Sequence, residues 1–321
     1  MHVLVTGAAG FIGSTLADRL LAAGDRVTAI DSFHPYYPRE TKEENAAAIR
    51  NHAQARFFEL DLAFDDLAEA TDGIDAVVHL AAQPGVRGSW GSSFASYLDA
   101  NVLSTQRLLD ACRGLSLHAW VYASSASVYG NDAVDAVDEQ TLPAPHSPYG
   151  VTKLAGEHLA HLYRRNHDVP TLSLRMFSVY GPRERPDKAI QRFLVASRDG
   201  LEVQLFGDGS QRRDFTFVDD AVDAVQAALE RAPIGETMNV ARGHTVTLSE
   251  ILDVIARVTG KPLALTRTAA ETGDVRVTSA IIDRAARFLD YAPSIDVEEG
   301  IRRQWARVLM ANDSTRPPAG I

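Results

Sequence analysis

Tyr149 and Lys153 are the side chains whose types and spacing point most directly to acid–base chemistry. They lie four residues apart in a stretch with helical periodicity, so they share one helical face. A phenol with its ordinary pKa of ~10 is protonated at neutral pH, but nearby positive charge favours the phenolate. We therefore interpret Tyr149 as a general base that Lys153 assists. A surface tyrosine with an unrelated lysine is the alternative.

A serine-rich run supplies hydroxyl groups close to a predicted strand end. Ser124 and Ser125 follow an apolar stretch that starts at Trp120. If this stretch belongs to a parallel sheet, Ser125 lies at the carboxyl edge, where such sheets bind their ligands. Its hydroxyl can then hydrogen-bond the group that gives its proton to Tyr149. A cap at the strand end is the other interpretation of Ser125.

Three glycines, Gly7, Gly10 and Gly13, come directly after the apolar run His2 to Thr6 and open an amphipathic stretch. Gly7 permits a tight turn, Gly10 lets backbone amides approach a pyrophosphate, and Gly13 lets a helix pack closely on the strand. The phosphates would face the positive end of that helix. The pattern predicts a dinucleotide site.

Asp31 ends the second apolar run, where a carboxylate accepts hydrogen bonds from ribose hydroxyls and repels a 2′-phosphate. This favours NAD over NADP, although Asp31 could also cap a turn. Asp61 is predicted either to bind the adenine amino group or to cap a turn, and the run His79 to Gly85 to pass beside the cofactor. The residues predicted to bind NAD are Gly7, Gly10, Phe11, Ile12, Gly13, Asp31, Asp61, Leu62, Leu80, Ala81, Ala82, Tyr149 and Lys153.

The net charge of -10 over 321 residues argues against a protein that tracks nucleic-acid phosphates, because such proteins concentrate positive charge. A single cysteine, Cys112, excludes an internal disulfide and fits a reducing, cytoplasmic compartment. We find no signal segment and no apolar run of membrane-spanning length. His158 and His161 share a helical face but have no third ligand at a suitable spacing, so no metal is expected.

Short apolar strands alternate with amphipathic helical stretches through the first half of the chain. The expected strands are His2 to Thr6, Arg26 to Ile30, Arg56 to Leu60, Ala76 to Leu80 and Trp120 to Ser124; the expected helices are Phe11 to Ala23, Lys42 to His52, Phe94 to Arg113 and Tyr149 to Arg164. Repeated strand–helix–strand units require a parallel sheet with helices on both faces. The predicted fold class is α/β: a doubly wound Rossmann sheet with a smaller C-terminal lid domain.

The alternation stops near Gly181, where Pro- and Arg-rich sequence begins, and shorter helices are expected near Val218 to Arg231 and Leu248 to Val258. We expect residues 1–177 to form the NAD-binding domain. Residues 178–311 should form mainly the substrate-binding domain, with some segments returning to the first. Residues 312–321 lack periodicity and are expected to be a flexible tail.

Five segments, in this order and spacing, resemble the extended short-chain dehydrogenase/reductase family, in particular its nucleotide-sugar epimerases and dehydratases. They are TGAAGFIGS, HLAAQPGVR, ASSASVYG, YGVTK and VYGPRERPD. The resemblance runs from residue 1 to about 305 and is closest to UDP-glucuronate and UDP-glucose 4-epimerases. It implies NAD as cofactor, a UDP-sugar as substrate, and Ser125, Tyr149 and Lys153 as catalytic residues.

The same resemblance implies two further features. Asn101 falls in a segment that often completes a proton relay in this family. Helices covering residues 93–113 and 147–165 are expected to pair with their copies in a homodimer.

An acidic protein that binds a diphosphate needs cations beside it, and arginine matches phosphate and carboxylate oxygens bidentately. By resemblance, Arg213 and Arg276 are expected near the diphosphate and Arg185 at a sugar carboxylate or the polar rim of the substrate. Arg87 follows the cofactor loop and is expected in the sugar pocket. A solvated surface position is the alternative for these arginines. The predicted substrate-binding residues are Arg87, Ser178, Arg185, Arg213 and Arg276.

Oxidation at C4 of the sugar is the first step that the resemblance implies, and the other side chains in the pocket decide which product forms. The family's 4,6-dehydratases carry an Asp-Glu pair where this chain has Ala126 and Ser127. A 4-epimerase needs no further base, so 4-epimerisation is the predicted reaction. The first alternative is a 5,6-dehydratase of UDP-N-acetylglucosamine, of the kind found in tunicamycin (antibiotic) biosynthesis. The second is a non-catalytic NAD-binding regulatory protein.

Overall fold

The computed structural model describes residues 1–130, 136–268 and 277–310. Its main lobe is built on a seven-stranded sheet in the order β10-β6-β5-β4-β1-β2-β3, in which every neighbouring pair is parallel. The order reverses between β1 and β4, which is the switch point of a doubly wound sheet. The predicted fold class is therefore confirmed. The strands are β1 (His2–Thr6), β2 (Arg26–Asp31), β3 (Ala55–Glu59), β4 (Ala76–His79), β5 (Ala119–Ser125), β6 (Thr171–Met176) and β10 (Thr237–Val240).

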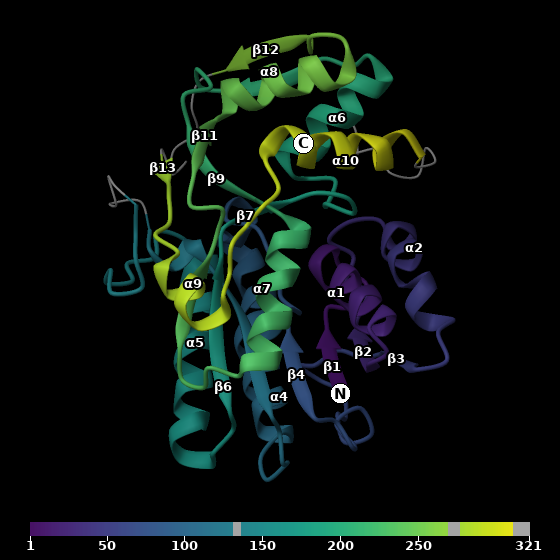
Figure 1. Cartoon of the computed structure of the whole chain (residues 1–321), viewed down its shortest axis with the longest axis vertical. Helices are drawn as coiled ribbons and strands as arrows, with labels where there is room; N and C mark the ends of the chain where they lie inside the picture. The colour runs from purple at the N-terminus through teal and green to yellow at the C-terminus, as the bar shows by residue number, and fades with distance from the viewer. Residues whose placement is uncertain (131–135, 269–276, 311–321) are drawn as a thin grey trace.

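Helices cover both faces of this sheet (Figure 1). Val3 and Val5 of β1 enter one hydrophobic core and Leu4 enters the other, because successive side chains of a strand point to opposite faces. The first core includes residues of α1 (Phe11–Ala22), α2 (Arg39–Arg50), α7 (Val218–Arg231) and α9 (Asp283–Leu289). The second includes residues of α4 (Ser104–Ala111) and α5 (Pro148–His167).

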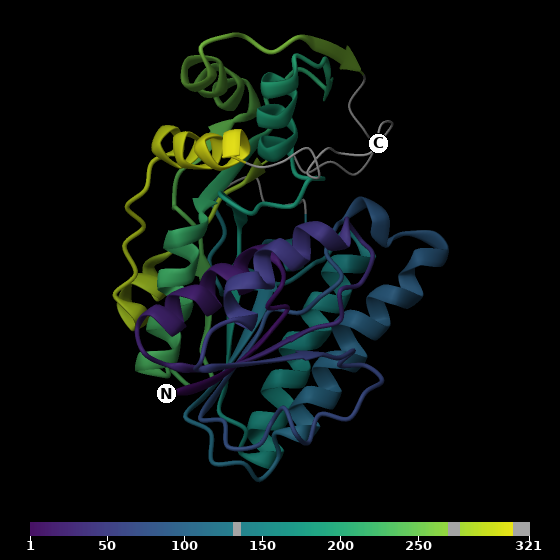
Figure 2. The same cartoon turned by 90° about the vertical axis from the view of Figure 1, so that its right-hand side faces the viewer.

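A smaller lobe stands over one edge of the sheet (Figure 2). It contains β7 (Ser178–Tyr180), β9 (Arg212–Phe217), β11 (Thr245–Thr247) and β13 (Val277–Thr278) in one sheet, and β8 (Val203–Phe206) paired with β12 (Leu265–Thr268). Its helices are α6 (Ala189–Asp199), α8 (Leu248–Thr259) and α10 (Val297–Met310). Because β10 and α7 join the main lobe, the chain crosses back after residue 178; the domain boundary at residue 177 stays a prediction. No helix in the described parts of the chain is long and apolar enough to cross a membrane.

One expected helix is interrupted. The stretch predicted as a single helix from Phe94 to Arg113 consists of α3 (Phe94–Tyr97), a π-helical turn (Leu98–Leu103) and α4. A π-helical turn is wider than an α-helical one and is frequently found at functional sites. Hydrophobic periodicity does not show it, because the residues on either side remain helical.

A buried ion pair fixes α5 to the sheet. Arg175 of β6 donates through Nε and Nη2 to the carboxylate of Glu157 on α5, at 2.9 and 2.8 Å, and both residues are buried. The hydroxyl of Ser124 on β5 also hydrogen-bonds Glu157, and Arg175 Nη1 donates to the Tyr129 hydroxyl at 2.9 Å. The pair therefore joins α5, which carries Tyr149, to β5 and β6.

Glu157→Gln leaves the Arg175 guanidinium buried without its counter-charge, so we expect the free energy of unfolding to fall by about 3–5 kcal/mol. Urea unfolding followed by circular dichroism measures this loss. Glu69→Gln is the matched control, because Glu69 pairs with Arg56 at 3.0 Å on the surface and its loss should cost at most about 1 kcal/mol. Equal losses in the two variants would contradict the special role of the buried pair.

Candidate active site

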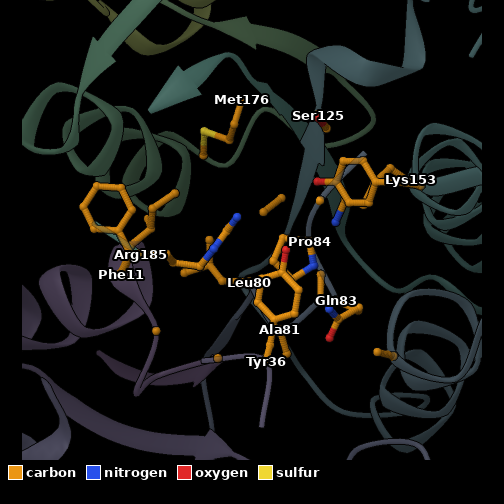
Figure 3. Close-up of a pocket in the computed structure, with 18 of the residues that line it drawn as sticks. Phe11, Tyr36, Leu80, Ala81, Gln83, Pro84, Ser125, Lys153, Met176 and Arg185 are labelled. Atoms are coloured by element: carbon orange, nitrogen blue, oxygen red, sulfur yellow. The ribbon is translucent and has the colours of Figure 1, made fainter. Parts of the chain in front are cut away.

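A cavity of about 1050 Å³ lies at the carboxyl ends of the main-sheet strands, below the smaller lobe. Figure 3 shows Ser125 and Lys153 on one side of it and Phe11 and Arg185 on the other. Of the predicted site residues, Arg276 falls outside the described ranges. The others that line the cavity are Gly7, Gly10, Phe11, Ile12, Gly13, Asp31, Asp61, Leu62, Leu80, Ala81, Ala82, Arg87, Ser125, Tyr149, Lys153, Ser178, Arg185 and Arg213.

Two glycines at the junction of β1 and α1, Gly7 and Gly13, have no room for a side chain. Gly7 has a φ of +69°, and a Cβ there would lie 2.9 Å from the backbone nitrogen of Ala81. A Cβ at Gly13 would lie 2.2 Å from the Gly7 carbonyl oxygen. Helix α1 begins after Gly10 with no side-chain cap, so its first N–H groups keep their hydrogen-bonding capacity. Such a helix start fits a pyrophosphate.

Asp31 and Asp61 line the cavity, and each also stabilises a local turn. Asp31 accepts hydrogen bonds from Ala9 N at 3.0 Å and Phe33 N at 2.8 Å. Asp61 accepts one from Ala63 N at 2.9 Å. A carboxylate has about four acceptor sites, so these bonds leave capacity for a ribose or adenine donor. The turn roles are observed, and the cofactor contacts stay predictions.

The start of α5 presents Tyr149 to the cavity. The Ser147 side chain caps the helix by accepting from Gly150 N at 3.1 Å. A Cβ at Gly150 would lie 2.5 Å from the Ser127 carbonyl oxygen, so only glycine lets α5 approach the end of β5 this closely. The approach places Tyr149 in hydrogen-bonding contact with Ser125. Ser125 Oγ also accepts from Ser127 N at 3.1 Å, so it caps the strand end as well.

Burial and two neighbouring groups, Ser125 and Arg185, set the electrostatics of Tyr149. Burial raises the pKa of Tyr149, while the hydrogen bond to Ser125 and the charge of Arg185 oppose that rise. Burial lowers the pKa of Lys153 to about 7, against the attraction of Glu157. An amine with that pKa carries its positive charge below about pH 7, where the charge favours the phenolate. Arg185, which stays protonated at higher pH, also favours the phenolate.

Lys153 is held on an aromatic surface. Its Nζ lies 4.5 Å from the centroid of the Tyr122 ring, which is buried beside Trp120 and His79. Burial and the charge of Lys153 lower the pKa of His79 to about 3, so this imidazole is neutral at physiological pH. The ring face of Tyr122 favours the ammonium form, whereas the burial of the site opposes it.

Asn101 holds two segments together. It is buried in the π-helical turn, where its Nδ2 donates to Gln83 O at 3.1 Å and to Thr152 Oγ1 at 2.9 Å. Its Oδ1 accepts from Gln83 N at 2.7 Å. These bonds use both amide N–H groups and join the loop after β4 to α5. Participation of Asn101 in a proton relay stays a prediction.

Arginines reach the cavity from three segments: Arg87 from a short 3₁₀ turn after β4, Arg185 from the segment after β7, and Arg213 from β9. They bring positive charge to one site in an acidic protein, which suits an anionic substrate. The Arg185 side chain is 19% exposed, so a fully solvated position is wrong for it. His158 and His161 are exposed, and no cluster of three or more potential metal ligands occurs in the chain as described.

Two lysines at the cavity were missed in the sequence. Lys42 of α2 lies 3.7 Å from the Asp31 carboxylate and donates to His34 O at 3.0 Å. Lys188 precedes α6 and lines the cavity, where burial and the charge of Arg185 lower its pKa. Both lysines lie in polar stretches, and contacts with distant segments bury them. The position of Lys188 in the Arg-rich run after Gly181 was the available signal.

Lys153 predicts a pH dependence of stability. Its folded pKa of about 7 lies below the ordinary value of 10.5, so between these pH values the unfolded chain binds more protons and stability rises with pH. From pH 7 to 9 the unfolding free energy of wild type should gain about 2 kcal/mol relative to Lys153→Met. Urea unfolding of both proteins, stripped of dinucleotide, measures the difference. Parallel pH profiles would show that Lys153 is not desolvated.

Comparison with known proteins places the chain in a family. The model of the NAD dependent epimerase/dehydratase family matches residues 3–241. The chain is 39% identical to YtcB of Bacillus subtilis, an uncharacterized UDP-glucose epimerase, over 95% of this chain and 97% of the relative. It is 32% identical to the UDP-glucuronate 4-epimerase of Thermodesulfobacterium geofontis, over 95% of this chain and 96% of the relative.

The structure is similar to a crystal structure of UDP-glucuronic acid 4-epimerase from Bacillus cereus in complex with UDP-glucuronic acid and NAD. The TM-score is 0.93 at 39% identity, with 97% of this chain and 99% of the other covered. The family match spans most of the main lobe and β7 to β10 of the chain. The protein therefore belongs to the NAD-dependent epimerase/dehydratase family.

Proposed function

We propose that this protein is an NAD-dependent enzyme that interconverts UDP-sugars by 4-epimerisation. The observation that carries the proposal is that Tyr149 and Ser125 line the same cavity as the turn at Gly7, where a side chain would collide with the backbone. Family membership supports it, as do the NAD and UDP-glucuronic acid in the complex of the Bacillus cereus enzyme.

The turn between β1 and α1 fits NAD, because Gly7 and Gly13 let α1 start tight against β1 and the loop after β4, and the first N–H groups of α1 have no side-chain cap. The residues proposed to hold it are those predicted from the sequence, with Asp31 at the adenosine ribose. When bound, NAD supplies the reversible oxidation of the sugar.

The protein's own residues handle the proton. In the proposed mechanism the phenolate oxygen of Tyr149 takes the proton of the C4 hydroxyl, and Ser125 hydrogen-bonds the same sugar oxygen before and after oxidation. Arg185 favours the phenolate. Tyr149 returns the proton when C4 is reduced again, so inversion at C4 consumes no proton.

The composition of the lining favours inversion over elimination. Ala126 and Ser127 follow Ser125, where 4,6-dehydratases carry an acid and a base. Among the lining residues that the structure describes, the carboxylates are Asp31, Asp61 and Asp99. Asp31 ends β2 and Asp61 follows β3, three and four strands away from β5, which ends at Ser125. Asp99 lies in the π-helical turn. A 4-epimerase requires only that the oxidised sugar turn within the pocket before it is reduced.

We propose a cytoplasmic location. The single cysteine, Cys112, is a buried free thiol. Burial raises its pKa to about 12, so it has little thiolate to oxidise. This state suits a reducing compartment.

The reaction can be assigned with UDP-glucose, UDP-glucuronate and UDP-N-acetylglucosamine, each incubated with the protein and followed by proton NMR. We expect the 4-epimer of at least one sugar to accumulate to equilibrium. A new vinyl signal with loss of the C6 oxygen would instead assign 5,6-dehydration. Tightly bound NAD without turnover of any sugar would support the regulatory alternative.

Tyr149→Phe removes the proposed base and is expected to lower kcat by about 10²–10⁴-fold. Binding of the UDP-sugar, measured by isothermal titration, should change by less than about twofold, since the diphosphate contacts remain. Tyr163→Phe is the matched control on the same helix, because its hydroxyl contacts Asp110 and Gln106. Full activity of Tyr149→Phe would remove Tyr149 from the mechanism.

We also propose that the protein is a homodimer. The helices expected at the interface expose apolar side chains: Leu98 and Leu103 of the π-helical turn, and Val151 and Leu162 of α5, are 37–52% exposed. Two copies of this face would bury these side chains against each other, as in a C₂ interface. The family resemblance provides the choice of a second copy as the partner.

Leu162→Glu places a charge on this face, so we expect the protein to elute as a monomer in gel filtration at concentrations where wild type is a dimer. Leu309→Glu on α10, where Leu309 is 57% exposed, is the control and should leave the elution unchanged. A wild-type protein that elutes as a monomer at every working concentration would refute the dimer.

A further inference from the structure

Arg185 forms an ion pair with Asp187, a carboxylate of its own segment. Its Nε and Nη2 each donate to one oxygen of Asp187 at 2.9 Å, a bidentate pair. Arg185 lines the cavity, whereas Asp187 is outside the described lining and its side chain is 40% exposed. Of this pair, the guanidinium therefore lines the cavity and the carboxylate does not.

The Nη1–Nη2 edge of the guanidinium has N–H donors that Asp187 does not use. A guanidinium has five N–H groups, and Asp187 uses one on Nε and one on Nη2. Within the described ranges, Arg185 Nη1 has no hydrogen-bond acceptor from the protein. The outer N–H groups of Nη1 and Nη2 form a second fork, which matches the two oxygens of a carboxylate.

Arg185 lies near the proposed base. The two side chains line the same cavity, and the charge of Arg185 opposes the rise of the Tyr149 pKa that burial causes. C6 of a hexose is attached to C5, the neighbour of C4, so a carboxylate at C6 falls beside the C4 hydroxyl that Tyr149 is proposed to deprotonate. A uronate thus brings its carboxylate to the second fork.

A tyrosine from the main lobe completes the arrangement. The Tyr36 ring lies under the guanidinium, with Arg185 Cζ 5.5 Å from its centroid, and both residues face the cavity in Figure 3. Burial and the adjacent Asp187 carboxylate raise the pKa of Tyr36 to about 12. Tyr36 follows β2, so the Arg185–Asp187 pair is fixed from both lobes.

We propose that Asp187 is a positioning residue for uronate recognition: it fixes the Nε–Nη2 edge of Arg185 so that the adjacent Nη1–Nη2 edge receives the C6 carboxylate of a UDP-hexuronate. The proposal rests on the proposed function and names its preferred substrate class. A C6 hydroxyl offers a single neutral oxygen, so a neutral UDP-hexose depends less on how Arg185 is held.

The test compares UDP-glucuronate and UDP-glucose, which differ only at C6, in Asp187→Ala, Arg185→Ala and the double variant. In Asp187→Ala we expect KM for UDP-glucuronate to rise about tenfold with little change in kcat, while both constants for UDP-glucose stay within about twofold. In the Arg185→Ala background, the added Asp187→Ala should change neither KM, because its effect passes through Arg185. Glu69→Gln, which removes an exposed partner of Arg56, is the matched control and should match wild type.

Three results would overturn the proposal. The first is an unchanged ratio of the two KM values in Asp187→Ala. The second is an equal KM change from Asp187→Ala in the wild-type and Arg185→Ala backgrounds, and the third is a wild type that prefers UDP-glucose. Isothermal titration of both UDP-sugars gives the same comparison from binding alone. Wild type that binds UDP-glucuronate through this pair without epimerising it would reject the proposed function and keep the positioning role, so the two failures are distinguishable.

Discussion

The close approach of α5 to β5 is the constraint on which the candidate site depends. Glycines permit it: a Cβ at Gly150 or Gly156 would lie 2.5 or 2.0 Å from an atom of the β5 side, the latter from the Tyr122 hydroxyl. Because the helix lies this close, the phenol of Tyr149 reaches the strand end and the amine of Lys153 is buried. The same contact removes water from both groups, which is why burial raises one pKa and lowers the other.

Desolvation then decides which cation can assist the base. An amine loses its proton readily when it is buried, whereas a guanidinium keeps its charge because its pKa is far above neutrality. Arg185 therefore acts on Tyr149 at every pH of interest, although it comes from a segment 36 residues further along the chain. Lys153 contributes charge only below its depressed pKa.

The main sheet and the glycine turn were predictable because their signals are local. Apolar runs set the strands, and β1 was predicted at its observed bounds, His2–Thr6. The residues of the cavity were predictable where they stand at strand ends or in motifs, as Ser125 does. The π-helical turn at Leu98–Leu103 was not, because the bonds of Asn101 that accompany it are tertiary. For the same reason the charge balance around Tyr149, which depends on burial and on Arg185, could not be predicted from spacing.

The two roles proposed for Arg185 oppose each other. Its positive charge favours the phenolate of Tyr149, and its free edge is suited to an anionic substrate. A carboxylate bound to that edge cancels part of the charge, so the tighter the anion is held, the less Arg185 lowers the pKa of the phenol. Asp187 already pairs with the same guanidinium at 2.9 Å. For an anionic sugar, Arg185 therefore lowers the pKa of Tyr149 less than it does for a neutral sugar, so the substrate that fits its free edge best is also the one whose deprotonation it assists least.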